Sequence, residues 1–436
     1  LLPVLRSLPD FSKVAAAIGE IRVFAFFEKL SLDFISWRTL TLFYLFFALP
    51  LLYIPGHHTT SRSIRVFYMM AVTVLVFVVP KLRAVLVTNI RALGKWGGEL
   101  LAVVILFMVV SSVMANQVPL LMLFGRSPEY MGILAWLSVI FFSLFFAGRV
   151  RELLFSKTTL LLMTLVLAGS LSIGMDAIWE GYRIPGLMMQ ATTMAMYAVL
   201  AVVIALGVGL QKGVTSWVRK VSVGCFCLAI AIIIFTQSRV GYVGLVIVLT
   251  YFATQVVHAR KVLAGLLAAA VLAVTLFVTM GSGQYVQRMH AASVDRGITY
   301  RLDMYKVTGR DIIRHNLFIG NGPGALPISL NNIDVVPEDI AVTLSERYLF
   351  VSSHDLFLDI SQYFGLFVGV TTLLACVLAF TKRSKNHVRD GQLQIAFVVL
   401  LLNAVCNTIS PEITAVFGMV LFGLLMAPRR TASKHA

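Results

Sequence analysis

The sequence predicts an all-α polytopic membrane protein with about twelve transmembrane helices. Hydrophobic residues make up 59% of the chain and charged residues 13%. Soluble domains have about half apolar and about a quarter charged residues. The apolar residues also gather in stretches of about 17 to 25 residues, the length that crosses a hydrocarbon core. We therefore expect the chain to lie in a lipid bilayer.

Each predicted transmembrane helix is an apolar run that ends at polar or charged residues. The twelve runs cover residues 33–54, 64–80, 99–118, 130–148, 158–175, 187–210, 219–236, 240–257, 261–280, 356–380, 392–408 and 411–427. An even number of crossings places both termini on the same side of the membrane.

Basic residues concentrate on one side of these runs. Lys and Arg are frequent in both tails and in the short connections at 81–98, 149–157, 211–220, 258–261 and 381–391. The short connections on the other side carry only Arg62, Arg126 and Arg183. By the positive-inside rule, the basic side with both termini is cytoplasmic. Topology thus explains the net charge of +16, whose scattered clusters form no continuous patch for nucleic acid.

The chain is predicted to divide into three regions. Residues 1–280 form an N-terminal membrane region of about nine transmembrane helices, and residues 356–436 form a C-terminal one of about three. Between them, residues 281–355 form one large external loop, in which we expect amphipathic helices. Loops of this length are usually functional.

A short polar turn joins the predicted spans 219–236 and 240–257 on the external side. It runs from Thr236 to Tyr242 and leaves no room for a loop. Arg239 is therefore held between two helix ends, where a charge is costly unless it reaches headgroups or meets an anion. Two roles stay open for Arg239: binding an anionic ligand, or pairing with lipid headgroups and helix-end carbonyls.

The centre of the external loop has the pattern of an amphipathic helix. Apolar residues recur at helical spacing over residues 299–315, and a glycine-rich turn follows at 320–324. Arg301 lies in the first turn, where free N–H groups favour an anion, and its planar guanidinium suits phosphate. The alternative for Arg301 is a solvated or headgroup-binding face, which is our interpretation of Arg310 and Arg314.

A histidine marks the point where the external loop enters the predicted span 356–380. His354 belongs to the residue type best suited to proton transfer at neutral pH. Asp355 and Asp359 follow it in positions to orient its ring or to bind ligand hydroxyls. The alternative is a histidine that caps a helix or bonds a carbonyl. The histidines show no metal-ligand spacing such as H-x-x-x-H, so we expect no metal site.

These motifs, in this order, resemble the O-antigen ligase and O-antigen polymerase superfamily. The motifs that carry the resemblance are Ser238-Arg239-x-Gly241, the loop-helix Arg301, His315-Asn316-x-x-x-Gly320-x-Gly322 and His354-Asp355-x-x-Leu358. By motif, the resemblance covers about residues 230–375. The helix count and the one large external loop extend it to the whole chain.

The resemblance implies a GT-C-like glycosyltransferase of the bacterial inner membrane that acts on the periplasmic face in lipopolysaccharide biosynthesis. Its donor would be an undecaprenyl diphosphate-linked glycan, and its acceptor the lipid A-core oligosaccharide. The two family arginines match Arg239 and Arg301, which would bind the donor diphosphate, and the catalytic histidine matches His354. The usual His-Asn pair of the family is His354-Asp355 here. Glu412 is the nearest match to an acidic residue in the last external loop.

A mechanism that needs neither metal nor cofactor follows from these residue types. Two guanidinium groups can neutralise the charge that develops on a diphosphate leaving group. His354 would take the proton from the acceptor hydroxyl, which attacks the anomeric carbon in line and inverts it.

Two alternatives stay open. An O-antigen polymerase or a protein O-oligosaccharyltransferase of the same superfamily would use the same donor with another acceptor, but the loop lacks a large appended domain, which favours the ligase. A lipid-linked sugar transporter would place charges near the bilayer midplane. Here the charges inside the runs lie near their ends, as Arg38, Arg65 and Asp359 do.

Overall fold

The protein is largely helical. The computed structural model describes residues 35–52, 58–114, 123, 125–127, 130–175, 186–188, 191–211, 213–255, 305–310, 312, 317–323, 355–381, 387–406 and 411–427. In these ranges the only strands are β1 (Gly125–Ser127) and β2 (Tyr130–Met131), which pair antiparallel. Apart from this short hairpin, the described residues are consistent with the predicted all-α membrane protein.

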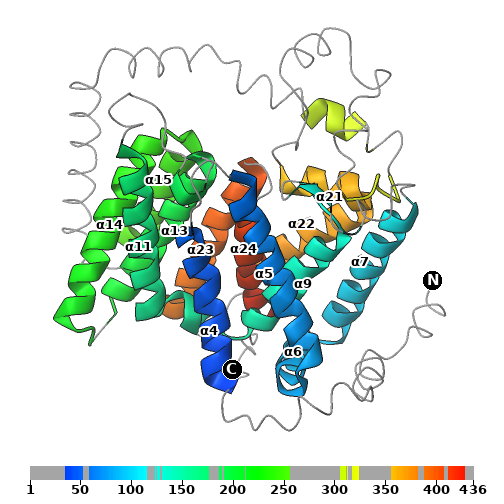
Figure 1. Cartoon of the computed structure of the whole chain (residues 1–436), viewed down its shortest axis with the longest axis horizontal. Coiled ribbons are helices and arrows are strands. Elements are labelled where there is room, and N and C mark those ends of the chain that lie inside the picture. The colour runs from blue at the N-terminus through cyan, green and yellow to red at the C-terminus, as the bar shows by residue number, and fades with distance from the viewer. Residues whose placement is uncertain are drawn as a thin grey trace, which may run out of the picture.

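The described helices form one bundle (Figure 1). Those before the external loop are α4 (Ile35–Ala48), α5 (His58–Val78), α6 (Pro80–Ala92), α7 (Lys95–Met114), α9 (Ile133–Ala147), α10 (Val150–Leu154), α11 (Lys157–Ile173), α13 (Ala191–Gly209), α14 (Ser216–Thr236) and α15 (Arg239–Gln255). Two 3-10 turns, η1 (Leu49–Leu51) and η2 (Gly186–Met188), lie among them. After the loop come α21 (Leu356–Phe364), α22 (Leu366–Thr381), α23 (His387–Cys406) and α24 (Pro411–Met426).

Eleven of the twelve predicted runs coincide with described helices, and the run 261–280 lies outside the described residues. By length and apolarity, α7, α13 and α14 can each cross a membrane. The bent pair α5 and α6 passes the same test as one unit, and several further apolar helices are 10–17 residues long. The described chain is therefore consistent with a helical membrane protein.

The predicted span 356–380 is two helices rather than one. The chain breaks at Gly365, which adopts φ 91°, between α21 and α22. A positive φ ends the regular helix and is accessible to glycine at little cost. Hydropathy did not reveal the break because the residues on both sides are apolar.

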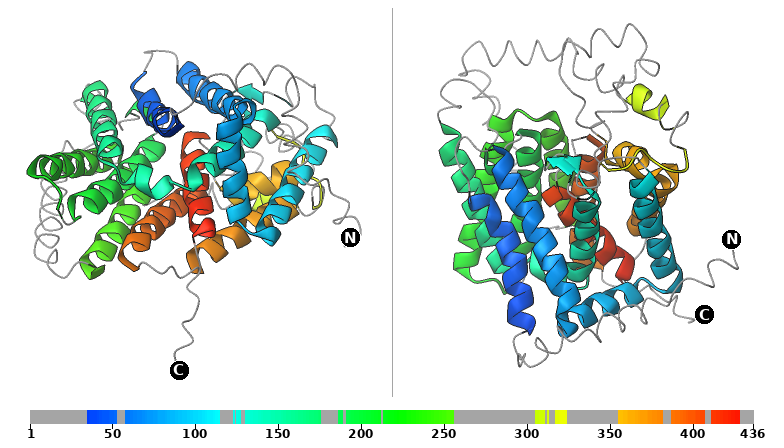
Figure 2. Two further views of the ribbon diagram at one scale, coloured as in Figure 1. Left: turned by 90° about the horizontal axis from the view of Figure 1, so that it is seen from below. Right: turned by 45° about the vertical axis from the view of Figure 1, so that its right-hand side comes forward.

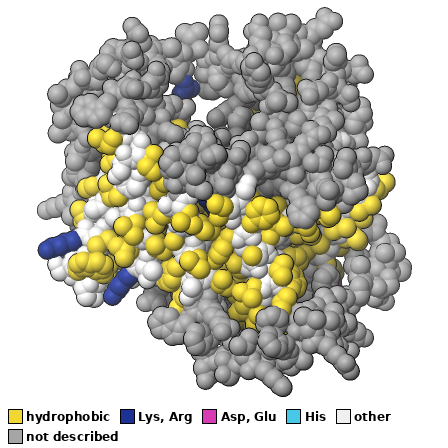
Figure 3. All heavy atoms as spheres, viewed as in Figure 1, with side chains coloured by type: hydrophobic (Ala, Val, Ile, Leu, Met, Phe, Trp, Pro, Cys, Tyr) yellow, Lys and Arg dark blue, Asp and Glu magenta, His cyan; other side chains and the backbone are white. Residues whose placement is uncertain are grey.

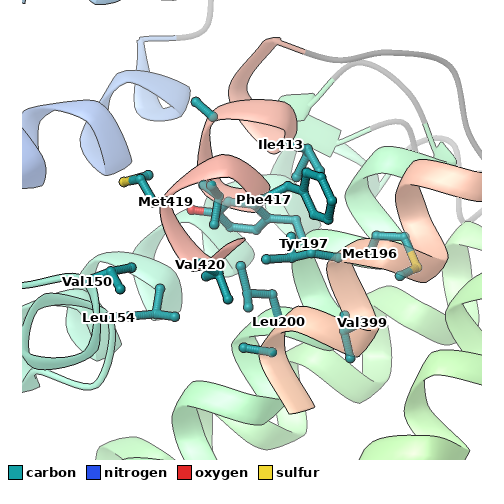
Figure 4. Packing of buried hydrophobic residues seen from close by; sticks show 14 of the residues in the cluster. Val150, Leu154, Met196, Tyr197, Leu200, Val399, Ile413, Phe417, Met419 and Val420 are labelled. Carbon is teal, nitrogen blue, oxygen red and sulfur yellow. The ribbon is translucent and has the colours of Figure 1, made fainter. Parts of the chain in front are cut away.

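Helix α13 forms the centre of the core. Its side chains are buried on every face from Thr193 to Val208, as expected for a helix that is hydrophobic all round. Helices α11, α14, α15 and α23 pack around it. Figure 4 shows Tyr197 of α13 lying against Phe417 of α24, so the last helix closes the same core.

The outer helices expose apolar side chains instead. On α22, Val370, Leu374 and Leu378 recur every four residues and are 44%, 56% and 56% exposed. Figure 3 shows hydrophobic side chains as a broad belt across one face, with Lys and Arg side chains near its lower left end. Such a belt is unfavourable in water and favourable against lipid.

Candidate functional site

The turn before Arg239 is made by two residues with specific backbone roles. Gln237 ends α14 in the left-handed conformation, with φ 50° and ψ 36°. Ser238 then caps α15, because its Oγ accepts the Gly241 N–H at 3.4 Å and its carbonyl accepts the Tyr242 N–H at 3.1 Å. The prediction that this turn leaves no room for a loop is confirmed.

Arg239 is therefore the first residue of α15, and its side chain is exposed. The first turn of a helix carries free N–H groups and the positive end of the helix dipole. A guanidinium at this position adds positive charge to a positive end, which costs free energy unless an anion is near. The position is therefore suited to an anionic ligand, which is one of the two roles left open for Arg239.

Close packing between α15 and α13 fixes the position of this helix start. A Cβ on Gly241 would lie 2.9 Å from Ala195 Cβ, and one on Gly244 would lie 3.2 Å from Val199 Cγ1. Small residues at a helix contact let two helices in a membrane approach closely. Arg239 is thereby held next to the central helix of the core.

Asp355 caps α21, the helix that follows the loop. Its Oδ1 accepts the backbone N–H of Phe357 at 2.8 Å and of Leu358 at 3.0 Å. Aspartate and asparagine are both good N-cap residues, so this position suits either amide or carboxylate. This explains how Asp355 can replace the asparagine of the resembled family.

Two opposing effects act on the Asp355 carboxyl, which lies just before the predicted span 356–380. Burial raises the pKa of Asp355 above its ordinary value, and the N–H groups of Leu358 and Phe357 lower it. The net pKa shift is upward because desolvation is the larger effect. Asp359, one turn further on, is fully buried at 0% exposure.

The glycine-rich segment 317–323 packs against the end of α21. The Asn321 N–H donates to Gln362 O at 2.8 Å, and the Gly322 N–H donates to Tyr363 O at 2.9 Å. Gly320 lies so close to the backbone of Tyr363 that a Cβ would overlap it. The predicted turn is confirmed for the residues described, and Gly322 has φ 82°.

Helix α7 supports this junction from the side. The Ser111 Oγ donates to both Gly320 O at 3.1 Å and Tyr363 O at 2.8 Å. Trp136 of α9 also packs edge-on against Phe364, with ring centroids 5.7 Å apart. The start of the C-terminal region is therefore fixed by helices that precede it by more than 200 residues in sequence.

Part of the predicted loop helix is described. Residues 305–310 and 312 are helical, within the predicted range 299–315. Val307 and Thr308 are buried, whereas Arg310 is exposed, which agrees with its interpretation as a solvated or headgroup-binding residue. The Tyr305 hydroxyl donates to Val405 O at 3.2 Å, so this helix lies beside the last turn of α23.

Helix α23 is the common neighbour of all three motif regions. Both α15 and α21 pack against it, and the loop helix bonds its last turn. Tyr251 near the end of α15 meets Gly391 near the start of α23. Since the two helices run in opposite directions, Arg239 at the other end of α15 lies level with the last turns of α23.

Three of the predicted site residues lie outside the described part of the chain. These are Arg301, His354 and the side chain of Glu412. Arg239, Asp355 and Asp359 are described, and each lies on a helix that packs against α23. Among the described residues, no three His, Cys, Asp or Glu side chains gather as metal ligands would.

One buried charge was not among the predicted site residues. Arg65 of α5 is 1% exposed, and its Nη2 donates to Leu187 O at 3.1 Å. It borders a small pocket lined by Phe46, Phe47, Pro50, Tyr197, Ile413 and Val416. The sequence could have indicated Arg65 as a candidate, because a charge inside a predicted membrane span is often functional.

These features are consistent with a helical membrane protein in which α15, α21 and the loop helix all contact α23. Residues 223–373 match the protein family described as O-antigen ligase. The predicted resemblance is confirmed for this region, which is similar to the O-antigen ligase family. No curated protein matches the chain.

The family match supports a general conclusion about function. It implies a glycosyltransferase-like enzyme of the O-antigen ligase and polymerase superfamily, with lipid-linked glycan substrates and a membrane environment. The matching region begins in α14, ends in α22 and includes Arg239, Arg301 and His354. Glu412 lies beyond it.

Proposed function

We propose that this enzyme is an O-antigen ligase, which transfers a polysaccharide from undecaprenyl diphosphate to the lipid A-core oligosaccharide in lipopolysaccharide biosynthesis. The observation that carries the proposal is the position of Arg239. It begins α15 inside the family-matching region, beside the helix that also contacts α21 and the loop helix. A diphosphate is an anion that a helix start and a guanidinium can bind together.

The proposed reaction breaks the bond between the anomeric carbon of the glycan and the diphosphate oxygen. Arg239 and Arg301 neutralise the charge that moves onto the departing undecaprenyl diphosphate. The acceptor hydroxyl forms the new bond from the opposite face, so the anomeric centre inverts. Neither metal nor cofactor takes part.

His354 is the proposed general base, and it accepts the proton of the acceptor hydroxyl. Asp355 follows it directly and is tied to α21 through Oδ1, which gives the chain a fixed point next to the base. Asp359 and Glu412 are proposed as supporting acids. Of these residues, Asp355 has the clearest structural task, which is to cap the helix.

The proposed setting is the bacterial inner membrane. The chain would cross it about twelve times, with both termini cytoplasmic and the active site on the periplasmic face. Residues 1–280 and 356–436 would form the membrane regions, and residues 281–355 the periplasmic loop. The exposed apolar belt and the apolar helices support a multi-pass arrangement.

Transfer by the purified protein from a defined lipid-linked donor tests the proposed base. His354→Ala should abolish transfer while donor binding persists, because the base acts only on the acceptor. Full activity of His354→Ala would exclude the proposed base. A metal chelator should leave the rate unchanged.

The two arginines are tested with matched controls. Arg239→Ala and Arg301→Ala should weaken both donor binding and transfer, with transfer falling by about 10²- to 10³-fold. Arg219→Ala on α14 and Arg310→Ala on the loop helix remove exposed charges outside the proposed site and should change little. Equal losses in all four variants would point to a general charge effect.

The acceptor separates the ligase from its relatives. The same donor is offered with lipid A-core oligosaccharide, with a second donor glycan, or with an acceptor protein. Transfer to lipid A-core alone supports the ligase, whereas chain extension indicates a polymerase and protein glycosylation an O-oligosaccharyltransferase. Uptake of the donor into vesicles without transfer would indicate a transporter.

A further inference from the structure

The backbone turns sharply between α5 and α6. The two helices are bent by 97° at the break between Val78 and Pro80. Val79 is extended there, and Pro80 opens α6 without an N–H, so α5 cannot continue. Figure 2 (right) shows α6 running across the end of α5 toward the start of α7.

The lengths of the neighbouring helices set the level of α6. Helix α5 has 21 residues and α7 has 20, and each is therefore about 30 Å long, the thickness of a hydrocarbon core. Helix α6 joins the end of one to the start of the other. With α5 and α7 each crossing the bilayer, α6 lies along the membrane surface, at the level of the lipid headgroups.

One face of α6 is fixed to the protein. Leu82, Leu86 and Asn89 recur at helical spacing and are buried. The Asn89 side-chain amide donates to Leu144 O at 2.8 Å and Phe145 O at 3.0 Å, which caps the last turn of α9. This face holds α6 against the end of the bundle.

The other face is basic. Lys81 and Arg91 are exposed on it, and residues 79–95 contain no Asp or Glu. Arg83 is half-buried between the two faces, and its Nη1 is buried with no hydrogen-bond partner in the described part of the chain. A guanidinium carries five N–H donors, so the accessible side of Arg83 can bind a phosphate beside the helix.

Exposed tryptophans lie at the start of two helices, α7 and α14, and indicate the same headgroup level as α6. Trp96, the second residue of α7, is 79% exposed, and Trp217, the second residue of α14, is 58% exposed. Tryptophan is enriched where hydrocarbon meets headgroups. The basic face of α6 therefore lies beside lipid headgroups rather than deep in water.

We propose that α6 is a binding site for anionic phospholipid, in which Lys81, Arg83 and Arg91 hold headgroup phosphates and Trp96 lies at the edge of the acyl chains. Charge complementarity favours this partner, because a lysine or arginine near an anionic surface attracts it. A soluble acidic polypeptide is the competing partner. The proposal is independent of the transferase activity.

The test uses the full-length protein in nanodiscs of neutral phosphatidylcholine. Brominated phosphatidylglycerol is added to one sample and brominated phosphatidylcholine, at the same mole fraction, to the other. Quenching of Trp96 is taken as the difference between the protein and Trp96→Phe. We expect the anionic lipid to quench Trp96 about threefold more, and salt to remove the excess.

The variant Lys81→Gln/Arg83→Gln/Arg91→Gln should abolish the excess. Its matched control, Lys157→Gln/Arg219→Gln/Lys220→Gln, removes the same amount of charge from exposed positions on α11 and α14. This control should keep the excess quenching of Trp96 by the anionic lipid. Equal quenching by both lipids in the unaltered protein would overturn the proposal, whatever the variants do. Binding of polyglutamate in neutral nanodiscs without any lipid preference would replace it with the acidic polypeptide.

Discussion

The Tyr305 hydroxyl donates to the carbonyl of Val405 at 3.2 Å, across 100 residues of sequence. Val405 lies one residue before the end of α23, so its carbonyl has no partner further along that helix. The bond joins the loop helix to α23, the helix against which α15 and α21 also pack. This contact therefore fixes the position of the loop helix relative to any ligand that binds beside it.

Tyr305→Phe should loosen the loop helix without unfolding the bundle. One hydrogen bond of this kind stabilises by about 0.5–1.5 kcal/mol. Hydrogen exchange at residues 305–312 should therefore be roughly two- to tenfold faster. Tyr242→Phe is the control, because that hydroxyl bonds Ile234 O within the same turn region at 3.3 Å. Unchanged exchange at 305–312 would show that the bond does not hold the helix.

Ser111→Ala should destabilise the protein, because the carbonyl of Gly320 loses its donor in a buried site. The expected cost is about 1–3 kcal/mol, measured as a lower unfolding temperature in detergent. Ser112→Ala is the matched control, since its Oγ bonds Met108 O one turn back at 2.7 Å, a local bond that adds little. Equal effects of the two substitutions would exclude a special role for Ser111.

The sequence predicted the helices of the bundle well, because apolar runs of membrane length have few other solutions. It did not predict the break at Gly365, which depends on one backbone angle inside an apolar run. For the site, residue type and side of the membrane pointed to Arg239. The contacts that support it, such as Tyr305 to Val405 and Ser111 to Tyr363, join distant segments and leave no local pattern.

Gly320→Ala should be more damaging than an ordinary surface change, because the new Cβ meets the backbone of Tyr363 and Phe364. Backbone atoms cannot move aside as a flexible side chain can, so we expect a loss of about 1–3 kcal/mol. Gly309→Ala, with nothing within 4 Å of its Cβ, should be neutral or stabilising. Thermal unfolding of both variants compares them directly, and equal stability would exclude the overlap.

Asp355→Asn should change how stability depends on pH. Burial raises the pKa of Asp355 above 3.8, so the folded protein holds this proton more tightly than the unfolded chain. That stabilisation is present below the unfolded pKa and is lost as pH rises through the folded pKa. At neutral pH the variant should therefore be at least as stable as the original protein, because its Oδ1 can still cap α21.

The advantage of Asp355→Asn should shrink as pH falls from neutral through the pKa of Asp355 in the folded protein, which lies above 3.8, because Asp355 itself then gains its proton. Thermal unfolding over this range measures the difference. Asp355→Ala is the control that removes the cap, and it should cost about 1 kcal/mol at either end of the range. An asparagine variant that is less stable than the original protein at neutral pH would contradict the upward shift.

Gly241→Ala should displace Arg239, because the two residues share the first turn of α15. The new Cβ would lie 2.9 Å from Ala195 Cβ, so α15 has to move away from α13. We expect a loss of about 1–3 kcal/mol in stability and a transfer rate that falls roughly tenfold or more. Gly224→Ala, with no atom within 4 Å of its Cβ, should leave both unchanged.

A second substitution separates this displacement from general damage. Ala195→Gly removes the atom that the new Cβ meets, so the pair Gly241→Ala/Ala195→Gly should regain both stability and transfer. Each single variant and the pair are measured by thermal unfolding and by transfer at a temperature where all remain folded. Recovery of stability without recovery of transfer would mean that Gly241 serves the ligand directly, through close approach of its backbone, and not through the position of Arg239.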